Sequence, residues 1–454
     1  MDCQRENLLS CNAGIYIHIP FCIKKCIYCD FYSISDLSLK QSFIAALLKE
    51  LKLRSNPALR VDTLYIGGGT PSLLTFEEID IILTAVSKNF SLMDSIQITM
   101  EVNPGTIISS KCYLSNIHAL GVNRLSIGVQ SFQDAKLHFL KRVHSADAAR
   151  KIIADARDAG FNDIGIDLIY GVPQESEQSW LYDLDSALQY TPEHLSCYML
   201  SYEPDTPMFD AYKKGFITPL KEETISSLFR LTSTHLVSKG FCHYEISNFA
   251  AKPHHQSRHN KKYWEMVPYL GFGPSAHSYD GEQLRSWNMK NVHEYIAILD
   301  HEKLPVLEKE FLTHEQRLME MVMVGLRTDQ GIDIYDFEQL CGSQFEIRFD
   351  KVLDRIDKMG WGRIDTKSPG KIDFKKHRDR FEKHRDRFEK HRDRFEKHRD
   401  RFEKHRDLFE KHRDQIDQNS SDINKNLKDR RFVLTLEGRL FMDTITRWFV
   451  EEMD

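Results

Sequence analysis

The sequence predicts an α/β fold, in which a partial (β/α)6, TIM-like barrel is followed by a small helical, winged-helix-like C-terminal domain. Short apolar runs alternate with amphipathic helical segments, such as those at 42–53, 76–87 and 146–159. Near-continuous apolar strands separated by helices are typical of a parallel sheet, and right-handed crossovers curl such a sheet toward a barrel. A doubly wound open sheet is the alternative. The six expected strands lie at 15–19, 63–66, 96–102, 124–129, 164–170 and 195–200.

The length and composition bound the kind of protein. A chain of 454 residues has room for two domains, which we place at 14–300 and 301–454 after an N-terminal tail at 1–13. A net charge of −5 argues against general nucleic-acid binding. The nine cysteines do not form a disulfide framework, and we find neither an export signal nor an apolar run that could span a membrane. We therefore expect a cytoplasmic protein without an integral membrane segment.

The first strand leads into a loop with three cysteines, Cys22, Cys26 and Cys29. Thiolates are the ligands of iron–sulfur clusters, and three of them can hold three corners of a [4Fe–4S] cube. The fourth iron then keeps an open coordination position, as a catalytic metal site requires. A zinc knuckle and simple buried cysteines are the alternatives. A zinc site would need a fourth Cys or His close by, which Asp30 and Phe31 do not supply.

The Cys-x3-Cys-x-aromatic-Cys spacing after a strand resembles the radical S-adenosylmethionine (SAM) enzymes. The preceding Tyr-x-His-x-Pro-Phe-Cys, which begins at Tyr16, narrows the resemblance to the oxygen-independent coproporphyrinogen III oxidase group and its haem chaperone branch, HemW. The resemblance covers about residues 14–363 and resumes near residue 431. It implies a radical SAM barrel with a [4Fe–4S] cluster whose open iron is chelated by SAM.

Two motifs after the second and third strands match the amino-group side of the family's SAM site. The glycines of Gly67-Gly68-Gly69-Thr70 allow a ligand to approach the main chain closely, although a tight turn would also need them. Glu101 ends the third strand, where a buried carboxylate is costly unless a cation meets it. A surface ion pair is the alternative there. The resemblance implies that Gly68, Gly69, Thr70 and Glu101 contact the SAM amino group.

Three residues further along match the rest of the SAM site. The amide of Gln130 can both donate to and accept from ribose hydroxyls, and the guanidinium of Arg142 matches the geometry of a carboxylate. Asp167 is a single charge amid an apolar strand, which packing does not explain. The resemblance assigns Gln130 and Asp167 to the ribose and Arg142 to the SAM carboxylate. It adds Tyr16 and Phe31 as SAM contacts and Tyr28 as a wall for adenine, where packing alone would also justify an aromatic residue.

A stretch rich in histidine and aromatic residues follows at 254–264. Imidazole is a good axial ligand of haem iron, and aromatic rings offer flat surfaces to a porphyrin; such loops can also be ordinary polar surface. The His-Asn-x-x-Tyr-Trp motif that begins at His259 resembles the mark of the HemW branch, which implies that His259 binds haem. We interpret residues 271–278 as a Gly/Pro-rich turn that closes the end of the barrel.

The C-terminal part predicts helices and an interrupted hairpin. Its two arms are expected at 360–364 and 431–438, before a helix at 443–450. Because neither flanking helix carries the basic face that DNA binding needs, a lid over the substrate opening is the better interpretation. The hairpin is interrupted at 374–414 by a charged seven-residue repeat with Phe at 381, 388, 395, 402 and 409. A coiled coil needs two apolar positions per heptad, so we favour a duplication tolerated in an exposed loop over a dimer arm or a histidine relay.

Two functions follow from the resemblance. As a haem chaperone, the protein would bind a [4Fe–4S] cluster, SAM and haem and transfer haem to an apo-haem acceptor protein, with a flavodoxin- or ferredoxin-type electron donor. As an oxygen-independent coproporphyrinogen III oxidase, it would decarboxylate propionates to vinyl groups. The family's oxidases carry a fourth cysteine two positions after the third, where this chain has Phe31. That difference favours the chaperone and leaves open whether the protein is an enzyme and whether it forms a homodimer.

Overall fold

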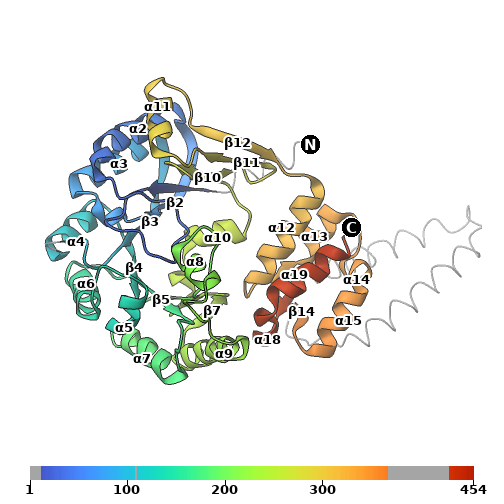
Figure 1. Cartoon of the computed structure of the whole chain (residues 1–454). Coiled ribbons are helices and arrows are strands. Elements are labelled where there is room, and N and C mark those ends of the chain that lie inside the picture. Colours follow the sequence, from blue (N-terminus) through green and yellow to red (C-terminus); the bar gives the residue numbers. More distant parts are fainter. Residues whose placement is uncertain (1–11, 108–109, 367–428, 454) are drawn as a thin grey trace, which may run out of the picture. The chain divides into compact units, whose positions relative to one another are not determined.

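The computed structural model describes residues 12–107, 110–366 and 429–453. The chain forms two compact units that divide between Thr313 and His314 (Figure 1), and each unit is described by itself. The expected tail at 1–13 lies outside the described residues except for its last two positions. The repeat at 374–414 lies entirely outside them. Among these residues, no helix has both the length and the apolar character needed to cross a membrane.

Six parallel strands form the centre of a twelve-stranded sheet in the first unit. Each strand pairs with the next one in chain order, so the direction of winding never reverses. The predicted partial (β/α)6 barrel is therefore confirmed, and the doubly wound alternative, which needs such a reversal, is wrong. The strands are β1 (Ala13–Ile19), β2 (Asn56–Gly68), β3 (Phe90–Val102), β4 (Arg124–Gln130), β5 (Ile164–Tyr170) and β6 (His194–Met199).

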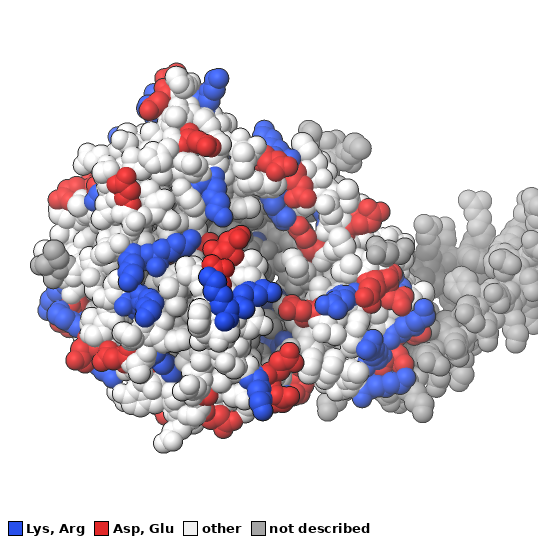
Figure 2. Space-filling model, in the orientation of Figure 1, with Lys and Arg blue, Asp and Glu red and all other residues white. Residues whose placement is uncertain are grey.

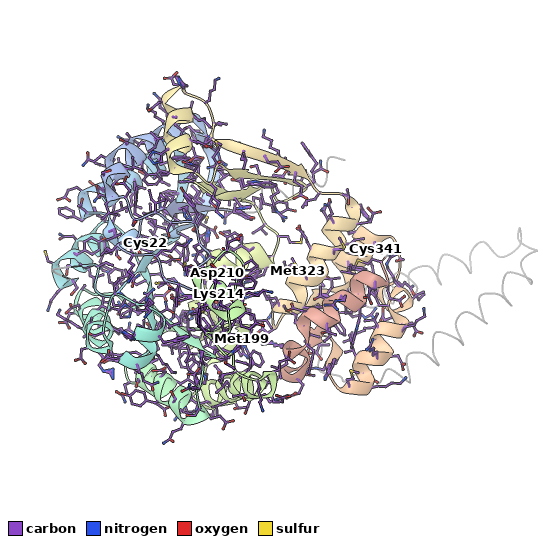
Figure 3. The ribbon with its side chains drawn as sticks, viewed as in Figure 1. Cys22, Met199, Asp210, Lys214, Met323 and Cys341 are labelled. Atoms are coloured by element: carbon purple, nitrogen blue, oxygen red, sulfur yellow. The ribbon has the colours of Figure 1, made fainter. Side chains whose placement is uncertain are left out.

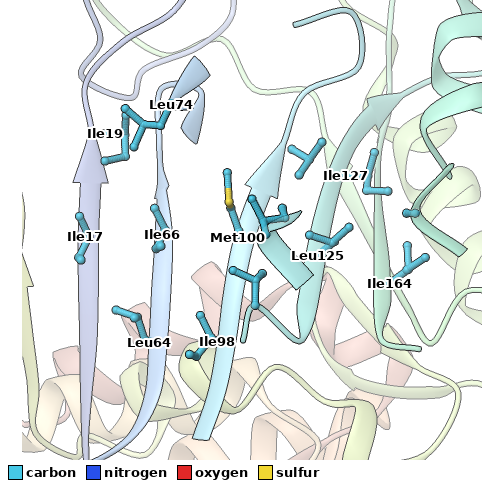
Figure 4. Close-up of a cluster of buried hydrophobic side chains, with 14 of the residues drawn as sticks. Ile17, Ile19, Leu64, Ile66, Leu74, Ile98, Met100, Leu125, Ile127 and Ile164 are labelled. Atoms are coloured by element: carbon cyan, nitrogen blue, oxygen red, sulfur yellow. The ribbon is translucent and has the colours of Figure 1, made fainter. Parts of the chain in front are cut away.

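An arc of helices surrounds these strands on the outside (Figure 1). Side-chain caps fix the starts of some of these helices; Thr75 forms a capping box with Glu78, and Ser145 accepts a hydrogen bond from the Ala148 amide. The outward side chains of the strands are apolar and buried under these helices, as the neighbouring residues labelled in Figure 4 illustrate. The helices are α2 (Lys40–Leu53), α3 (Phe76–Asn89), α4 (Ser110–Ala119), α5 (Asp134–Phe139), α6 (Ala146–Asp158), α7 (Glu177–Leu188) and α9 (Glu222–Ser238).

The sheet continues beyond the six strands at both edges. On one side β9 (Tyr269–Phe272) pairs in parallel with β1 and leads through β10 (His277–Tyr279) and β11 (Leu284–Asn288) to β12 (Val306–Phe311); on the other, β8 (Asn248–Ala250) and β7 (Cys242–Glu245) follow β6. The interpretation of 271–278 as a turn is thus correct only for its middle, because both ends pair as strands. Since β12 pairs with β11, the first unit extends past the expected boundary at 300.

A buried carboxylate, that of Glu50, connects helix α2 to the β9–β11 edge of the sheet. Glu50 on α2 accepts hydrogen bonds from the Gly273 amide, Asn288 and Tyr295 at 2.7–2.9 Å and pairs with Arg54. Tyr295 belongs to α11 (Val292–Asp300). A buried charge is tolerated when it is paired and hydrogen-bonded in this way. The network therefore fixes the β9–β10 turn against the barrel.

The second unit is the expected small helical domain with a three-stranded sheet. Strand β14 (Gly362–Thr366) pairs antiparallel with β15 (Arg430–Leu434), and β15 also pairs with β13 (Ile332–Asp333). The second hairpin arm ends before residue 438, because Thr435 caps a new helix by accepting from the Gly438 amide. The helices are α12 (His314–Arg327), α13 (Ile334–Cys341), α14 (Phe345–Arg348), α15 (Asp350–Met359), α18 (Leu436–Leu440) and α19 (Met442–Glu451).

Two surface properties bear on function. Basic and acidic side chains are interspersed over the face of the molecule seen in Figure 2, where no broad area of one sign stands out. The seven cysteines of the described residues are free thiols; Cys22 lies in the first unit and Cys341 in the second (Figure 3).

Candidate cofactor site

The inner face of β1–β6 is polar, in contrast to the outer face. Successive side chains of a strand point to opposite faces, so the residues between the apolar ones turn inward. In a packed TIM barrel these positions are mainly filled by branched apolar residues. Here they include tyrosines, histidines, hydroxyls and carboxylates, namely Tyr16, His18, Thr63, Tyr65, Thr99, Glu101, Ser126, Asp167, Ser196 and Tyr198. Such an interior can hold a polar ligand.

The three cysteines lie in one loop directly after β1. The loop is tied at its base, where the Cys22 amide donates to Ile34 O at 2.9 Å and the Ile34 amide donates to Pro20 O at 2.7 Å. All three thiols are partly buried, and burial raises the pKa of Cys29 to about 11. A thiol that resists deprotonation in the free protein becomes a thiolate when a metal binds it. The loop therefore presents three sulfurs that a metal cluster would deprotonate.

Two sulfurs of the loop already have polar neighbours. Thr70 Oγ1 donates to Cys22 Sγ at 3.4 Å, and Arg142 Nη1 donates to Cys26 Sγ at 3.5 Å. Among the described residues, no three His, Cys, Asp or Glu side chains are close enough to share a single metal ion. Thiolates that hold a cube bind three different irons and so need not converge on one point. The donor set fits a [4Fe–4S] cluster, which would be held by Cys22, Cys26 and Cys29.

The glycine run after β2 is required by close packing. A Cβ at Gly69 would lie 2.6 Å from Phe21 O, and the Gly69 amide donates to Ile19 O at 2.8 Å. Gly68 has a φ of +113°, which favours glycine, and its amide donates to Glu101. The tight-turn interpretation is therefore confirmed, while the contact of Gly68, Gly69 and the buried Thr70 with SAM stays a prediction.

Glu101 and Asp167 are two carboxylates on the inner face. Glu101 accepts from Tyr65 OH at 3.0 Å and from the Gly68 amide at 3.1 Å, and Asp167 accepts from Ser126 Oγ at 2.9 Å. Neither forms an ion pair with a Lys or Arg of the described residues, so the alternative of a surface ion pair for Glu101 is wrong. Burial, reinforced by the Asp167 charge, raises the pKa of Glu101 to about 7. Burial also raises the pKa of Asp167.

This arrangement calls for a cation. Two poorly solvated carboxylates that act on each other repel, and either a proton or a positive ligand relieves the repulsion. SAM carries an ammonium and a sulfonium. The pair of carboxylates therefore fits the cofactor that the sequence resemblance implies, without placing any atom of it.

Gln130 and Arg142 lie at the carboxyl end of β4 and just after α5. Gln130 has a φ of +65°, an uncommon conformation for a residue with a side chain. Its side-chain amide has no hydrogen-bond partner within the described residues. Arg142 donates to Gly128 O at 2.9 Å and to Asn103 Oδ1, and its buried Nε has no partner among the described residues. Strained backbone and unpaired polar groups are typical of ligand sites.

The predicted aromatic contacts divide into two groups. Tyr28 is packed near Leu140, and its hydroxyl lies 3.5 Å from Arg142 Nη1, so it belongs to the cysteine side of the site. Tyr16 OH donates to His18 Nδ1 at 3.0 Å; the other ring nitrogen of His18 donates to Tyr32 O at 2.8 Å. His18 is thus a buried histidine with both ring nitrogens hydrogen-bonded. Phe31 is 67% exposed and lines a cavity that Tyr16 and His18 also line.

His259 is buried beside Gly14, near the start of β1. It lies on the short helix α10 (Arg258–Trp264) and is 1% exposed. Its Nδ1 is 2.9 Å from Thr63 Oγ1 and its Nε2 is 2.9 Å from Tyr263 OH. Burial, and then the charge of Lys262, lower the pKa of His259 to about 3. Both ring nitrogens are hydrogen-bonded in this conformation, so ligation of haem by His259 would require one of the two hydrogen bonds to break.

Sequence reasoning missed several residues of the site. Tyr65 bonds Glu101, Asn103 accepts from Arg142, and Ser126 bonds Asp167. Tyr65 had a signal, because it is the one polar position in the apolar run 64–66. Asn103 precedes Pro104-Gly105 and was indistinguishable from a turn residue.

Comparison with protein families gives two matches. Residues 16–187 match the radical SAM superfamily, and residues 312–368 match the HemN C-terminal domain. The first match spans β1 to α7 and so includes the cysteine loop and each predicted SAM contact. The second lies mainly in the second unit.

Curated relatives are about one third identical to this chain over the aligned residues. "Heme chaperone HemW" of Mycobacterium tuberculosis is 34% identical over 71% of this chain and 83% of the relative, and that of Bacillus subtilis is 32% identical over 76% and 91%. A mouse protein, "Radical S-adenosyl methionine domain-containing protein 1, mitochondrial", is 32% identical over 73% and 76%. Among solved structures, coproporphyrinogen III oxidase (HemN) from Escherichia coli has a TM-score of 0.71 at 22% identity, covering 96% of this chain and 90% of that one. This last likeness is one of fold.

Proposed function

Because the chain belongs to the HemW branch of the radical SAM superfamily, we propose that it is a haem chaperone that carries a [4Fe–4S] cluster and SAM. In this proposal the protein binds haem and transfers it to an apo-haem acceptor protein. A flavodoxin- or ferredoxin-type protein would supply electrons to the cluster. The alternative from the same resemblance is the oxidative decarboxylation of coproporphyrinogen III.

The observation that carries the cofactor assignment is the presence, on the same barrel, of three thiols in the loop after β1 and of two inner-face carboxylates that form no ion pair within the described residues. Cys22, Cys26 and Cys29 would hold the cluster, and Glu101 would receive the SAM ammonium. When bound, a reduced cluster supplies one electron to the sulfonium of SAM. The protein's own part is to orient SAM and to exclude water from the site.

The remaining SAM contacts follow from the free hydrogen-bonding groups. Arg142, whose Nε lacks a partner within the described residues, is suited to the SAM carboxylate. The unpaired amide of Gln130 and the carboxylate of Asp167 are suited to the ribose hydroxyls. Tyr28 would cover the adenine, with Tyr16, Gly68, Gly69, Thr70 and Phe31 as the further predicted contacts.

The residue after Asp30 favours the chaperone over the oxidase. The family's oxidases carry a fourth cysteine at that position, and here Phe31 is an exposed aromatic side chain. The fold likeness to HemN fits both functions equally and does not decide between them. The second unit as a lid and the homodimer stay predictions.

The test is anaerobic reconstitution of the full chain with iron and sulfide, followed by separate additions of SAM, haem and coproporphyrinogen III. We expect the broad visible absorption of an iron–sulfur cluster, binding of SAM, and binding of haem without decarboxylated product. Cys22→Ala should lose the cluster, whereas Cys112→Ala, at an exposed cysteine of α4, should keep it. Formation of protoporphyrinogen would establish the oxidase instead, and failure of the wild type to bind haem would exclude the chaperone.

A further inference from the structure

The strand β4 ends in an irregular backbone centred on Gln130. Its pairing with β5 shifts register between Ile127 and Gln130, so that two residues of β4 face one of β5. The Ser131 amide then donates to Val129 O at 2.8 Å across Gln130, whose φ is +65°. A hydrogen bond over a single residue with positive φ defines the rare, strained form of the γ-turn. Bulges of this kind bend a strand and redirect a side chain, so the turn sets the direction of Gln130.

The redirected side chain of Gln130 lies over Gly128, beside Arg142. A Cβ at Gly128 would lie 3.0 Å from Gln130 Nε2 and 3.4 Å from Arg142 Nη2, so both groups use the space above a residue without a side chain. Arg142 Nη2 donates to Gly128 O at 2.9 Å, whereas the Gln130 amide forms no hydrogen bond in the part of the chain that the structure describes. The strained turn therefore holds an unpaired amide next to the guanidinium suited to the SAM carboxylate.

The strained turn is fixed by a buried carboxylate on α7. Asp183 accepts from Ser131 Oγ at 2.8 Å and from the Phe132 amide at 2.8 Å. These two residues directly follow Gln130, and the side chains of Ser131 and Asp183 are fully buried, so water does not compete for the contact. A strained backbone persists only where its surroundings fix it. Asp183 supplies that restraint.

The carboxylate of Asp183 is itself held by a cation. Lys136 Nζ on α5 donates to Asp183 Oδ2 at 2.7 Å and also to Glu175. Glu175 accepts from two backbone amides that follow β5. All three charged side chains are at most 7% exposed, and buried charges are tolerated when they are paired and hydrogen-bonded in this way. The three charges connect the carboxyl ends of β4 and β5, which carry the two predicted ribose contacts.

Stability of the fold does not explain this arrangement. Apolar side chains can often replace a buried group of ions with no loss of stability, and a strained turn lowers stability. A strand that ended without the turn would need neither the buried carboxylate nor its cation. The arrangement is explained when the direction of the Gln130 amide is what these contacts secure.

We propose that Asp183 and Lys136 are positioning residues that hold the Gln130 amide in the direction from which it binds the ribose of SAM. The inference rests on the proposed function, since it assumes that the chain binds SAM. Gln130 makes the contact with the ligand. Asp183 acts through Ser131 and the turn, and Lys136 acts through Asp183.

The experiment is a double-mutant cycle on SAM affinity, measured by calorimetry with the full chain after anaerobic reconstitution of the cluster. Ser131→Ala removes the bond from the turn to Asp183 and leaves the ion pairs in place, so the chain should fold. SAM binding should weaken by about three- to tenfold, the effect of one hydrogen bond. In a Gln130→Gly background the same change should have no further effect, because the amide that it positions is already absent.

A matched control and a second measurement separate positioning from folding. Ser233→Ala on α9 removes the hydroxyl of another buried serine, which bonds His243, and should keep wild-type affinity for SAM. Gln130→Gly should weaken SAM binding and leave the urea midpoint of the apo protein unchanged or higher, because glycine adopts a positive φ without strain. Asp183→Asn leaves Lys136 paired with Glu175 and should also weaken SAM binding.

Three results would overturn the inference. They are wild-type SAM affinity in Ser131→Ala or in Asp183→Asn, equal fractional losses from Ser131→Ala in the wild-type and Gln130→Gly backgrounds, and a lower urea midpoint in Gln130→Gly. A wild type that assembles the cluster and binds no SAM would instead contradict the proposed function.

Discussion

The outer and inner faces of the six parallel strands carry different chemistry on the same backbone. On the outer face, Ile66, Met100 and Ile127 are fully buried in the main hydrophobic core (Figure 4). On the inner face, their neighbours Tyr65 and Glu101 are polar, partly accessible and carry a raised pKa. The outer face therefore supplies the stability, and the inner face can accept charges that a packed core would exclude.

The difference between the two faces predicts whether a substitution changes the stability of the fold or the binding of a ligand. A change on the outer face removes apolar contacts and leaves a void, which destabilises the fold. A change on the inner face removes a ligand contact and can relieve unfavourable burial, which leaves the fold stable and weakens binding. The following predictions test the separation, beginning with the largest expected effect.

Ile66→Ala on β2 should lower the free energy of unfolding by about 2–5 kcal/mol, because its fully buried side chain cannot be replaced by solvent. Ser126→Ala on the inner face is the matched change and should cost about 1 kcal/mol, the loss of one hydrogen bond to Asp167. The measurement is urea denaturation of both apo proteins followed by near-UV circular dichroism. Equal losses in the two variants would mean that the inner face is also a structural core.

Much of this division could be predicted from the sequence. The apolar runs that predicted β1 to β6 are the outer face, and the polar residues between them include Glu101 and Asp167. Strands β7 to β12, at the two edges of the sheet, could not be predicted, because runs of three to six residues without a clear period carry no signal. The hydrogen bonding of His259 could not be predicted either, since its partner Thr63 lies 196 residues away in the chain. Hydrogen-bond partners of that separation are set by the fold alone.

Glu101→Gln should weaken SAM binding by roughly 10- to 100-fold, the effect of losing one charged hydrogen bond. The change keeps the shape of the side chain, so Tyr65 and Gly68 stay within hydrogen-bonding distance. It removes a carboxylate that forms no ion pair among the described residues. The unfolding free energy should therefore be unchanged or higher near pH 7. Calorimetry with reconstituted protein measures the affinity, and Glu77→Gln on the exposed surface of α3 is the control. A variant that loses stability and keeps its SAM affinity would assign Glu101 to the fold.

The pH dependence of SAM binding should follow the same carboxyl. With its pKa raised to about 7 from the ordinary glutamate value of 4.5, Glu101 is protonated below pH 7, and binding of a cation must expel the proton. The dissociation constant should rise about tenfold for each pH unit below 7, and Glu101→Gln should flatten that dependence. The stability of the apo protein depends on pH in the opposite direction to the SAM affinity. The folded state binds more protons than the unfolded state between pH 4.5 and 7, so this group's contribution to stability is present below 4.5 and is lost as pH rises to 7. A pH-independent affinity in the wild type would contradict the assignment.

Excision of residues 374–413 should have the smallest effect, because the segment joins two strands of the second unit and supplies no residue of the inner face. Strands β14 and β15 pair up to Thr366 and Arg430, so the ends that the segment connects are already neighbours. Shortening a loop between fixed ends changes the closure free energy by less than about 1 kcal/mol. The shortened chain should assemble the cluster and bind SAM with wild-type affinity, measured by absorption and calorimetry. Loss of both would mean that the inner face depends on a part of the chain far from its own strands, and the separation of the two faces would no longer account for the site.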